Sequence, residues 1–130
     1  MKFLVGYNGS TAAKSALTLA RDFAKVFGAK VFVLVSMEGG SSEKIEEINK
    51  ARADLEFAKE FLDQENVECE AREMVRGVSP AEDLVQFATD KNIDQIFVGI
   101  EKKTRTRKIL LGSTAQYVIL KAPCPVISVK

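Results

Sequence analysis

Short apolar segments alternate with longer segments of helical periodicity along the whole chain. Five short segments are predicted to be strands: 3–7, 31–35, 67–71, 93–99 and 125–129. Between them, apolar residues recur every three or four positions, which is typical of amphipathic helices. Connections of this length allow a crossover helix between parallel strands. The alternation therefore predicts an α/β fold, in which helices cover both faces of a doubly wound, five-stranded parallel sheet.

Four segments are predicted to be helices: 13–27, 45–62, 81–88 and 114–120. The third of these has a clear start, because Ser79, Pro80 and Glu82 form a capping box with proline at the first helical position. The third strand alternates apolar with charged residues, which predicts a strand at an edge of the sheet. In the second helix we expect one buried face, which consists of Ile45, Ile48, Arg52, Leu55, Ala58 and Leu62.

The composition of the chain excludes several kinds of chemistry. A chain of 130 residues can bury the core of one compact domain, which we expect to span residues 1–130. It has no histidine and only two cysteines, Cys69 and Cys124, so we expect no disulfide framework, no metal site and no catalytic residues. No apolar stretch approaches the roughly 18 residues of a membrane span. We therefore expect a cytoplasmic protein that has no membrane partner.

The segment 99–113, which follows the fourth predicted strand, concentrates positive charge. Five of the 19 basic residues lie between Glu101 and Lys108, although the net charge of the whole chain is only +1. In parallel sheets, ligands bind beyond the carboxyl ends of the strands, where the strand order reverses. The turns at 7–10 and 99–113 both lie at that end. If strands one and four are neighbours, these turns face each other across a cleft that can hold an anion.

Each of these features also has a purely structural explanation. A loop rich in lysine and arginine is often only solvated. Gly112 and Ser113 can form a turn and a helix cap, and residues 8–10 can do the same. The residues alone leave both explanations open.

Five segments of the chain together resemble the universal stress protein family, and the resemblance extends from the first strand to the last. These segments are 4–10, 77–80, 94–99, 109–113 and 122–126. The resemblance implies the strand order 3-2-1-4-5 of an adenine nucleotide alpha hydrolase-like fold. It also implies a regulatory domain that binds ATP or AMP in a stress response, with Mg²⁺ or Mn²⁺ if ATP is bound.

The phosphate-binding pattern of that family is altered in this chain. The nucleotide-binding branch of the family has the pattern Gly-x2-Gly-x9-Gly-Ser/Thr. Gly99, Gly112 and Ser113 match this pattern, whereas Lys102 stands at the middle glycine. Asn8 replaces the family's first-strand aspartate. A lysine ammonium is itself a common partner of phosphate, so the altered motif leaves open whether ATP is held.

The resemblance implies a nucleotide site built from two groups of residues. Those expected around the nucleoside are Gly6, Tyr7, Asn8, Ser36, Met37, Val98 and Gly99. Those expected around the phosphates are Lys102, Gly112, Ser113 and Thr114. Ser113 and Thr114 would open a helix whose free N–H groups can bind an anion.

Two other functions remain open at this point. Because Lys102 and Asn8 depart from the pattern, the chain also fits the branch of the family that does not retain ATP, as a homodimeric stress or interaction protein. Binding of a polyanion by the basic segment is a third hypothesis. That segment lacks aromatic residues on which bases could stack, so we expect no specific nucleic acid partner. We expect no enzymatic activity beyond slow ATP hydrolysis.

The last predicted strand carries the apolar residues Val126, Ile127 and Val129. If this strand lies last in the sheet it has an open edge, and exposed edges recruit partners. The pairing of two last strands in the family agrees with this reasoning. We therefore expect a homodimer that forms through the last strand.

Overall fold

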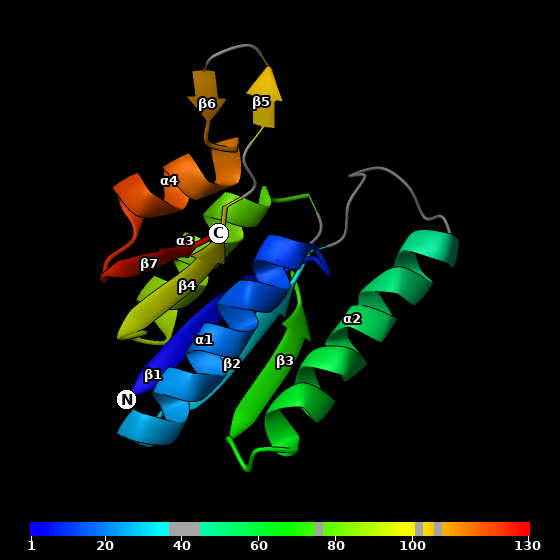
Figure 1. The fold of residues 1–130 in the computed structure, drawn as a ribbon, viewed down its shortest axis with the longest axis vertical. Coiled ribbons are helices and arrows are strands. Elements are labelled where there is room, and N and C mark those ends of the chain that lie inside the picture. The colour runs from blue at the N-terminus through cyan, green and yellow to red at the C-terminus, as the bar shows by residue number, and fades with distance from the viewer. Residues whose placement is uncertain (37–44, 75–76, 101–102, 106–107) are drawn as a thin grey trace.

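Five parallel strands form one sheet in the order β3-β2-β1-β4-β7 (Figure 1). The computed structural model describes residues 1–36, 45–74, 77–100, 103–105 and 108–130. The strands of this sheet are β1 (Lys2–Tyr7), β2 (Lys30–Val35), β3 (Cys69–Glu73), β4 (Gln95–Gly99) and β7 (Val126–Val129). All four pairings between neighbouring strands are parallel. The predicted strand order 3-2-1-4-5 is therefore confirmed.

Two helices cover each face of the sheet. On one face lie α1 (Thr11–Phe27), which packs on β1 and β4, and α2 (Ile45–Asp63), which packs on β2 and β3 (Figure 1). On the other face α3 (Pro80–Asp90) and α4 (Ser113–Lys121) pack against each other. The predicted doubly wound arrangement is confirmed. None of the described helices is both long enough and apolar enough to cross a membrane.

Alternate residues of β1 are buried on opposite faces of the sheet. Phe3, Val5 and Tyr7 belong to the apolar core under α1 and α2, whereas Leu4 belongs to the core under α3 and α4. Successive side chains of a strand point to opposite faces, so a strand that is covered on both faces must be apolar throughout. Residues 31–35 of β2 are all buried for the same reason.

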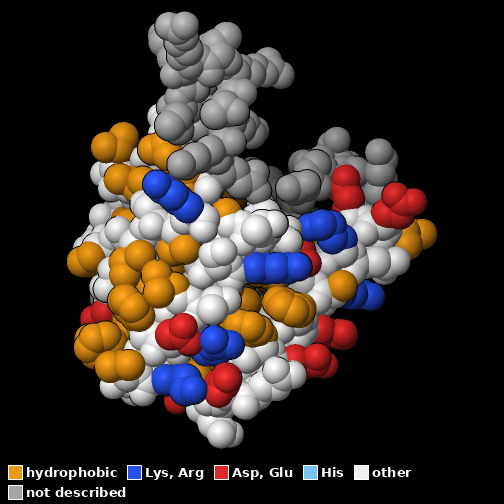
Figure 2. All heavy atoms as spheres, viewed as in Figure 1, with side chains coloured by type: hydrophobic (Ala, Val, Ile, Leu, Met, Phe, Trp, Pro, Cys, Tyr) orange, Lys and Arg blue, Asp and Glu red, His pale blue; other side chains and the backbone are white. Residues whose placement is uncertain are grey.

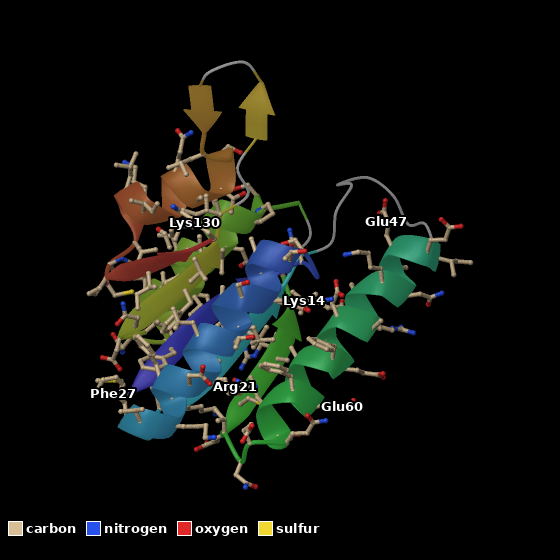
Figure 3. The ribbon with its side chains drawn as sticks, in the orientation of Figure 1. Lys14, Arg21, Phe27, Glu47, Glu60 and Lys130 are labelled. Atoms are coloured by element: carbon tan, nitrogen blue, oxygen red, sulfur yellow. The ribbon has the colours of Figure 1, made fainter. Side chains whose placement is uncertain are left out.

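Aromatic and basic side chains join α1 to α2 near the surface. Phe57 and Phe61 of α2 stack on each other, with their ring centroids 5.8 Å apart. The Lys14 ammonium lies 5.6 Å from the ring centroid of Phe57, and the Arg21 guanidinium lies 4.6 Å from that of Phe61. Figure 3 shows Lys14 and Arg21 on α1, beside α2. These cation–π contacts add to the attachment of α2, whose fully buried residues are few.

The buried face of α2 differs from the prediction. Ala51, Ala58 and Leu62 are buried, whereas Ile45 is 74% exposed and Arg52 is also exposed. This helix covers only one edge of the sheet, so a narrow apolar stripe is enough to attach it. Arg52 lies one position further round the helix than Ala51 and therefore turns toward solvent.

β3 is an edge strand, as the sequence predicts, but it begins later than expected. Val67 is buried, yet its N–H donates to the carbonyl of Leu62 at the end of α2. Residue 67 therefore belongs to the turn after the helix, and the strand starts at Cys69.

A small antiparallel hairpin lies in the segment 99–113, for which the sequence predicts only a loop. Its strands are β5 (Lys103–Arg105) and β6 (Lys108–Leu110), and they form a sheet separate from the main one. Figure 1 shows the hairpin beyond the start of α4, away from the main sheet. The hairpin escapes prediction because segments so rich in lysine and arginine carry no apolar strand signal.

Phe97→Ala is expected to lower the free energy of unfolding by about 3–5 kcal/mol. Phe97 is fully buried in β4, and its ring makes edge contacts with Phe3 and Phe23 at centroid distances of 5.2 and 5.7 Å. Phe27→Ala is the matched control, because Phe27 is 58% exposed and should cost roughly 1 kcal/mol or less. Chemical denaturation measures both variants, and equal losses would contradict this description of the core.

Candidate functional site

A cavity of about 340 Å³ opens at the carboxyl ends of β1 and β4. Its size lies at the lower end of the range for small-molecule sites. β1 and β4 pair directly, so the turns that follow them face each other, as the sequence predicts. The described residues that line the cavity are Gly6, Tyr7, Asn8, Ser10, Ala13, Ser36, Met74, Pro80, Leu84, Val98, Gly99, Gly112, Ser113, Thr114 and Ala115.

The fold brings most of the predicted site residues to this one cavity. Of the eleven, nine line it: Gly6, Tyr7, Asn8, Ser36, Val98, Gly99, Gly112, Ser113 and Thr114. The other two, Met37 and Lys102, lie outside the described residues. Residues expected around the nucleoside and residues expected around the phosphates thus line the same cavity. The role of each residue in binding a nucleotide stays a prediction.

Six of the lining residues are absent from the predicted site residues, for two different reasons. Ser10, Ala13 and Ala115 lie within a few positions of predicted residues, so the local pattern of turn and helix start could have indicated them. Met74, Pro80 and Leu84 come from the end of β3 and from α3. No local signal marks them, because only the packing of α3 over the ends of the strands brings them to the cavity.

Three helices begin at the cavity, and their starts dominate its electrostatics. α1, α3 and α4 contribute Ser10, Pro80 and Ser113, respectively, from their first turns or caps. The start of a helix carries a partial positive charge and free N–H groups. None of the described lining residues has a charged side chain. No group of His, Cys, Asp or Glu suited to hold a metal ion occurs in the described ranges. The described lining therefore favours an anion.

The start of α4 differs from those of α1 and α3 in its cap. Ser10 accepts a hydrogen bond from the N–H of Ala13 at 3.1 Å, and Ser79 accepts one from the N–H of Glu82 at 3.2 Å. Gly112 has nearly the same backbone angles, φ −60° and ψ 152°, but makes no side-chain cap. The first N–H groups of α4 are therefore left without a capping side chain at the wall of the cavity.

Gly99 and Gly112 are glycines for different reasons. A Cβ at residue 99 would lie 2.5 Å from the carbonyl carbon of Ala12, so only glycine lets the start of α1 approach the end of β4. A Cβ at residue 112 would meet no atom within 4 Å, and the φ of Gly112 is open to any residue. The fold therefore requires glycine at residue 99, whereas the described residues give no conformational or packing reason for glycine at residue 112.

The turn between β1 and α1 is held by its own side chains. Asn8 Oδ1 accepts a hydrogen bond from the N–H of Ser10 at 3.0 Å, and Gly9 adopts φ 78°. Positive φ is strained for residues other than glycine. This geometry agrees with the structural explanation of residues 8–10 as a turn and cap. The same turn lines the cavity through Asn8 and Ser10.

Tyr7 lines the cavity, and its side chain belongs to the core under α1 and α2. Its ring is buried and stacks on Phe57, with the centroids 6.1 Å apart. Burial, and secondarily the negative charge of Asp54, raises the pKa of the Tyr7 phenol to about 12. The hydroxyl therefore stays protonated at neutral pH and keeps its hydrogen-bonding capacity. Leu84 and Val98 lie on the same cavity and supply apolar surface.

Comparison with protein families and curated proteins gives one consistent result. The family described as the Universal stress protein family matches residues 1–130 of the chain. The universal stress protein MJ0531 of Methanocaldococcus jannaschii is 34% identical, over 99% of this chain and 81% of that protein.

Solved structures share the fold over the whole chain. A universal stress protein from Archaeoglobus fulgidus is 36% identical with a TM-score of 0.86, and the match covers 100% of this chain and 93% of that chain. A structure of the universal stress protein from the same organism in complex with dAMP is 34% identical, with a TM-score of 0.80, 100% coverage of this chain and 98% of that chain.

Gly99→Ala is expected to lower the free energy of unfolding by about 1–3 kcal/mol, because its Cβ would force α1 away from β4. Gly112→Ala is the matched control. Its Cβ enters open space, so we expect a change of about 1 kcal/mol or less. Urea unfolding of the two variants measures the difference. Equal stability of Gly99→Ala and the parent chain would contradict the close approach of the backbones.

Proposed function

Because the chain belongs to the universal stress protein family, we propose that it binds an adenine nucleotide in the cavity at the ends of β1 and β4. In this proposal the chain is a regulatory domain of the stress response, and its activity does not go beyond slow ATP hydrolysis. The observation that carries the proposal is the uncapped start of α4 at the wall of a cavity whose described lining residues carry no charged side chain. A cytoplasmic location stays a prediction.

The phosphate end of the ligand would lie at the start of α4. Gly112, Ser113 and Thr114 line the cavity there, and the N–H groups of the first helical turn have no capping side chain. A phosphate oxygen accepts hydrogen bonds from such N–H groups, and the partial positive charge of the helix start favours its negative charge. The glycine at residue 112 also leaves room for an oxygen close to the backbone.

The nucleoside end would lie against the apolar wall. Met74, Leu84 and Val98 offer apolar surface for a purine ring, and Asn8 and Ser36 are polar residues of the same lining. Small-molecule sites usually combine such apolar walls with a few polar groups. The dAMP complex of the 34% identical relative supports an adenine nucleotide as the class of ligand. Roles for Met37 and Lys102 rest on the sequence alone.

Mg²⁺ or Mn²⁺ would accompany ATP in this proposal. Such ions prefer oxygen ligands. The described lining offers hydroxyl and amide oxygens, for example those of Ser113, Thr114 and Asn8, but no carboxylate. The phosphates would therefore have to supply most of the ligands of the ion, and AMP would need no metal.

A second candidate is the branch of the family that does not retain ATP. One observation favours it: the Asn8 side-chain oxygen is already engaged by the N–H of Ser10 within the turn. In this alternative the cavity stays empty and the chain acts through its partners as a homodimer. The nucleotide titration below separates the two candidates.

AMP and ATP, the latter with and without Mg²⁺, are expected to raise the melting temperature of the protein. At ~100-fold excess over Kd, a ligand that binds only the folded state adds about 2.7 kcal/mol of stability. GMP at the same concentration is the control for general effects of phosphate. If neither AMP nor ATP changes the melting temperature at millimolar concentration, nucleotide binding is wrong and the alternative stands.

Gly112→Ser is expected to stabilise the protein and to weaken nucleotide binding at the same time. The backbone at Gly112 already has the angles at which Ser10 and Ser79 cap their helices. A serine oxygen would bond to the first-turn N–H groups and raise the free energy of unfolding by roughly 0.3 kcal/mol. The same N–H groups would then be lost to phosphate. Denaturation and calorimetric titration with AMP measure the two effects, and unchanged AMP affinity would contradict this assignment of the phosphate end.

We also propose that the chain forms a homodimer through β7. The two edges of the sheet differ in character. β3 presents charged residues, among them Glu70 and Arg72, which form an ion pair at 3.1 Å. β7 presents Val126, Ile127 and Val129, and α4 beside it exposes further apolar residues. Figure 2 shows hydrophobic side chains gathered on the side of the molecule where α4 and β7 lie. An apolar open edge favours pairing, whereas a charged edge opposes it.

Ser128→Pro is expected to produce a monomer that keeps the fold. The carbonyls of Pro125 and Val129 accept hydrogen bonds from β4, so the alternate residues Val126 and Ser128 direct their backbone groups to the open edge. Proline at residue 128 removes an N–H group that points to the open edge. No hydrogen bond between β7 and β4 is lost. Ser128→Ala should remain a dimer. Analytical ultracentrifugation at micromolar concentration measures both, and a monomeric parent chain would overturn the proposed dimer.

A further inference from the structure

α2 contacts the turn after β1 from outside the cavity. The Lys50 ammonium donates hydrogen bonds to the backbone carbonyl of Asn8 at 2.8 Å and to Asp54 Oδ2 at 3.1 Å. Lys50 and Asp54, which we call the α2 latch, are one helical turn apart and form an ion pair. None of the described residues of α2 lines the cavity. The latch nevertheless bonds directly to a turn that does.

The Asp54 carboxylate lies against the same turn. Its side chain is only 15% exposed, and its Oδ1 would lie 2.8 Å from a Cβ at residue 9. Glycine at residue 9 therefore provides the φ of 78° and also the space for the carboxylate. Because Lys50 holds the carboxylate and the carbonyl together, the turn is fixed on two sides by one helix.

Contacts within the turn continue from the latch to the cavity. Asn8 Oδ1 accepts a hydrogen bond from the N–H of Ser10, and Ser10 Oγ accepts one from the N–H of Ala13. Asn8, Ser10 and Ala13 all line the cavity. A shift of the Asn8 carbonyl would therefore move three lining residues together.

The latch is not needed to keep α2 on the sheet. Ala51, Ala58 and Leu62 bury the apolar stripe of this helix, and Phe57 stacks on Tyr7. The Lys50 side chain is 53% exposed, so its loss leaves no cavity, although the Asp54 carboxylate, whose side chain is 15% exposed, then loses its ion-pair partner. Removal of the latch should consequently change the turn without unfolding the helix.

We propose that Lys50 and Asp54 are positioning residues, which set the geometry of the turn at residues 8–10 and thereby the affinity of the cavity for an adenine nucleotide. This inference rests on the proposed function. In this proposal α2 controls the cavity, although none of its described residues lines the cavity. The effect passes through the Asn8 carbonyl and not through the charge of the pair.

Lys50→Met and Asp54→Asn distinguish positioning from simple charge effects. If the latch positions the turn, both substitutions weaken AMP binding, and we expect an affinity about fivefold to tenfold lower for Lys50→Met. If only long-range charge matters, loss of the Asp54 negative charge would strengthen the binding of the AMP anion. Lys59→Met, on an exposed position of the same helix, is the matched control and should leave the affinity unchanged. Lys50→Arg, which keeps a cationic donor, should restore most of the affinity.

Calorimetric titration with AMP and amide hydrogen exchange of the free protein are the two measurements. In Lys50→Met we expect faster exchange at the N–H groups of Ser10 and Ala13, with unchanged exchange around Ala58 and Leu62. If the parent chain binds AMP and Lys50→Met binds it equally well, the inference is overturned while the proposed function stands. Tighter binding by Asp54→Asn also overturns it. If the parent chain does not bind AMP at all, the proposed function fails and this inference fails with it.

Discussion

The parallel pairing of β1 with β4 determines where the cavity lies. The chain leaves β1 for α1 on one face of the sheet and leaves β4, after the hairpin, for α4 on the opposite face. Two helices that diverge in this way cannot fill the space above the ends of their strands. The approach of α1 to β4 is nevertheless very close, because Gly99 has no side chain to separate them. That contact keeps the start of α1 at the cavity, with Ser10 and Ala13 in its wall.

The described part of the cavity attracts an anion through backbone groups and not through side-chain charges. Three helices start there, and the described lining carries no ionisable group other than the Tyr7 phenol, whose pKa of about 12 keeps it neutral. Fixed backbone groups keep their orientation when no ligand is present, whereas long charged side chains must first be ordered. The arrangement suits a site that recognises phosphate together with a flat, apolar ring.

The sequence predicts those features that depend on local patterns. Continuous apolar runs identified the central strands, and the alternation of apolar and charged residues at 67–71 identified an edge strand. Both patterns are informative because burial on one face or on two faces determines which residue types a strand tolerates. Nine predicted site residues line the cavity because they follow the strands that the pattern defines.

Features that depend on distant packing were missed. Leu84 and Met74 reach the cavity only through the position of α3 and the end of β3. Arg52 was assigned to the wrong face, since the helical period alone does not show that α2 covers only an edge. The hairpin was missed because its residues are too charged to resemble strands.

The unequal edges of the sheet have a consequence for how large an assembly can become. A molecule with two adhesive edges can add copies at both ends without limit, and the result is a growing fibre. Here the edge at β3 carries the ion-paired side chains of Glu70 and Arg72, whereas the edge at β7 is apolar. A molecule with a single adhesive edge has a valency of one. Any sheet extended through β7 is complete after one addition, because both of its outer borders are then β3 strands, whose charged side chains would lose water if another copy were added.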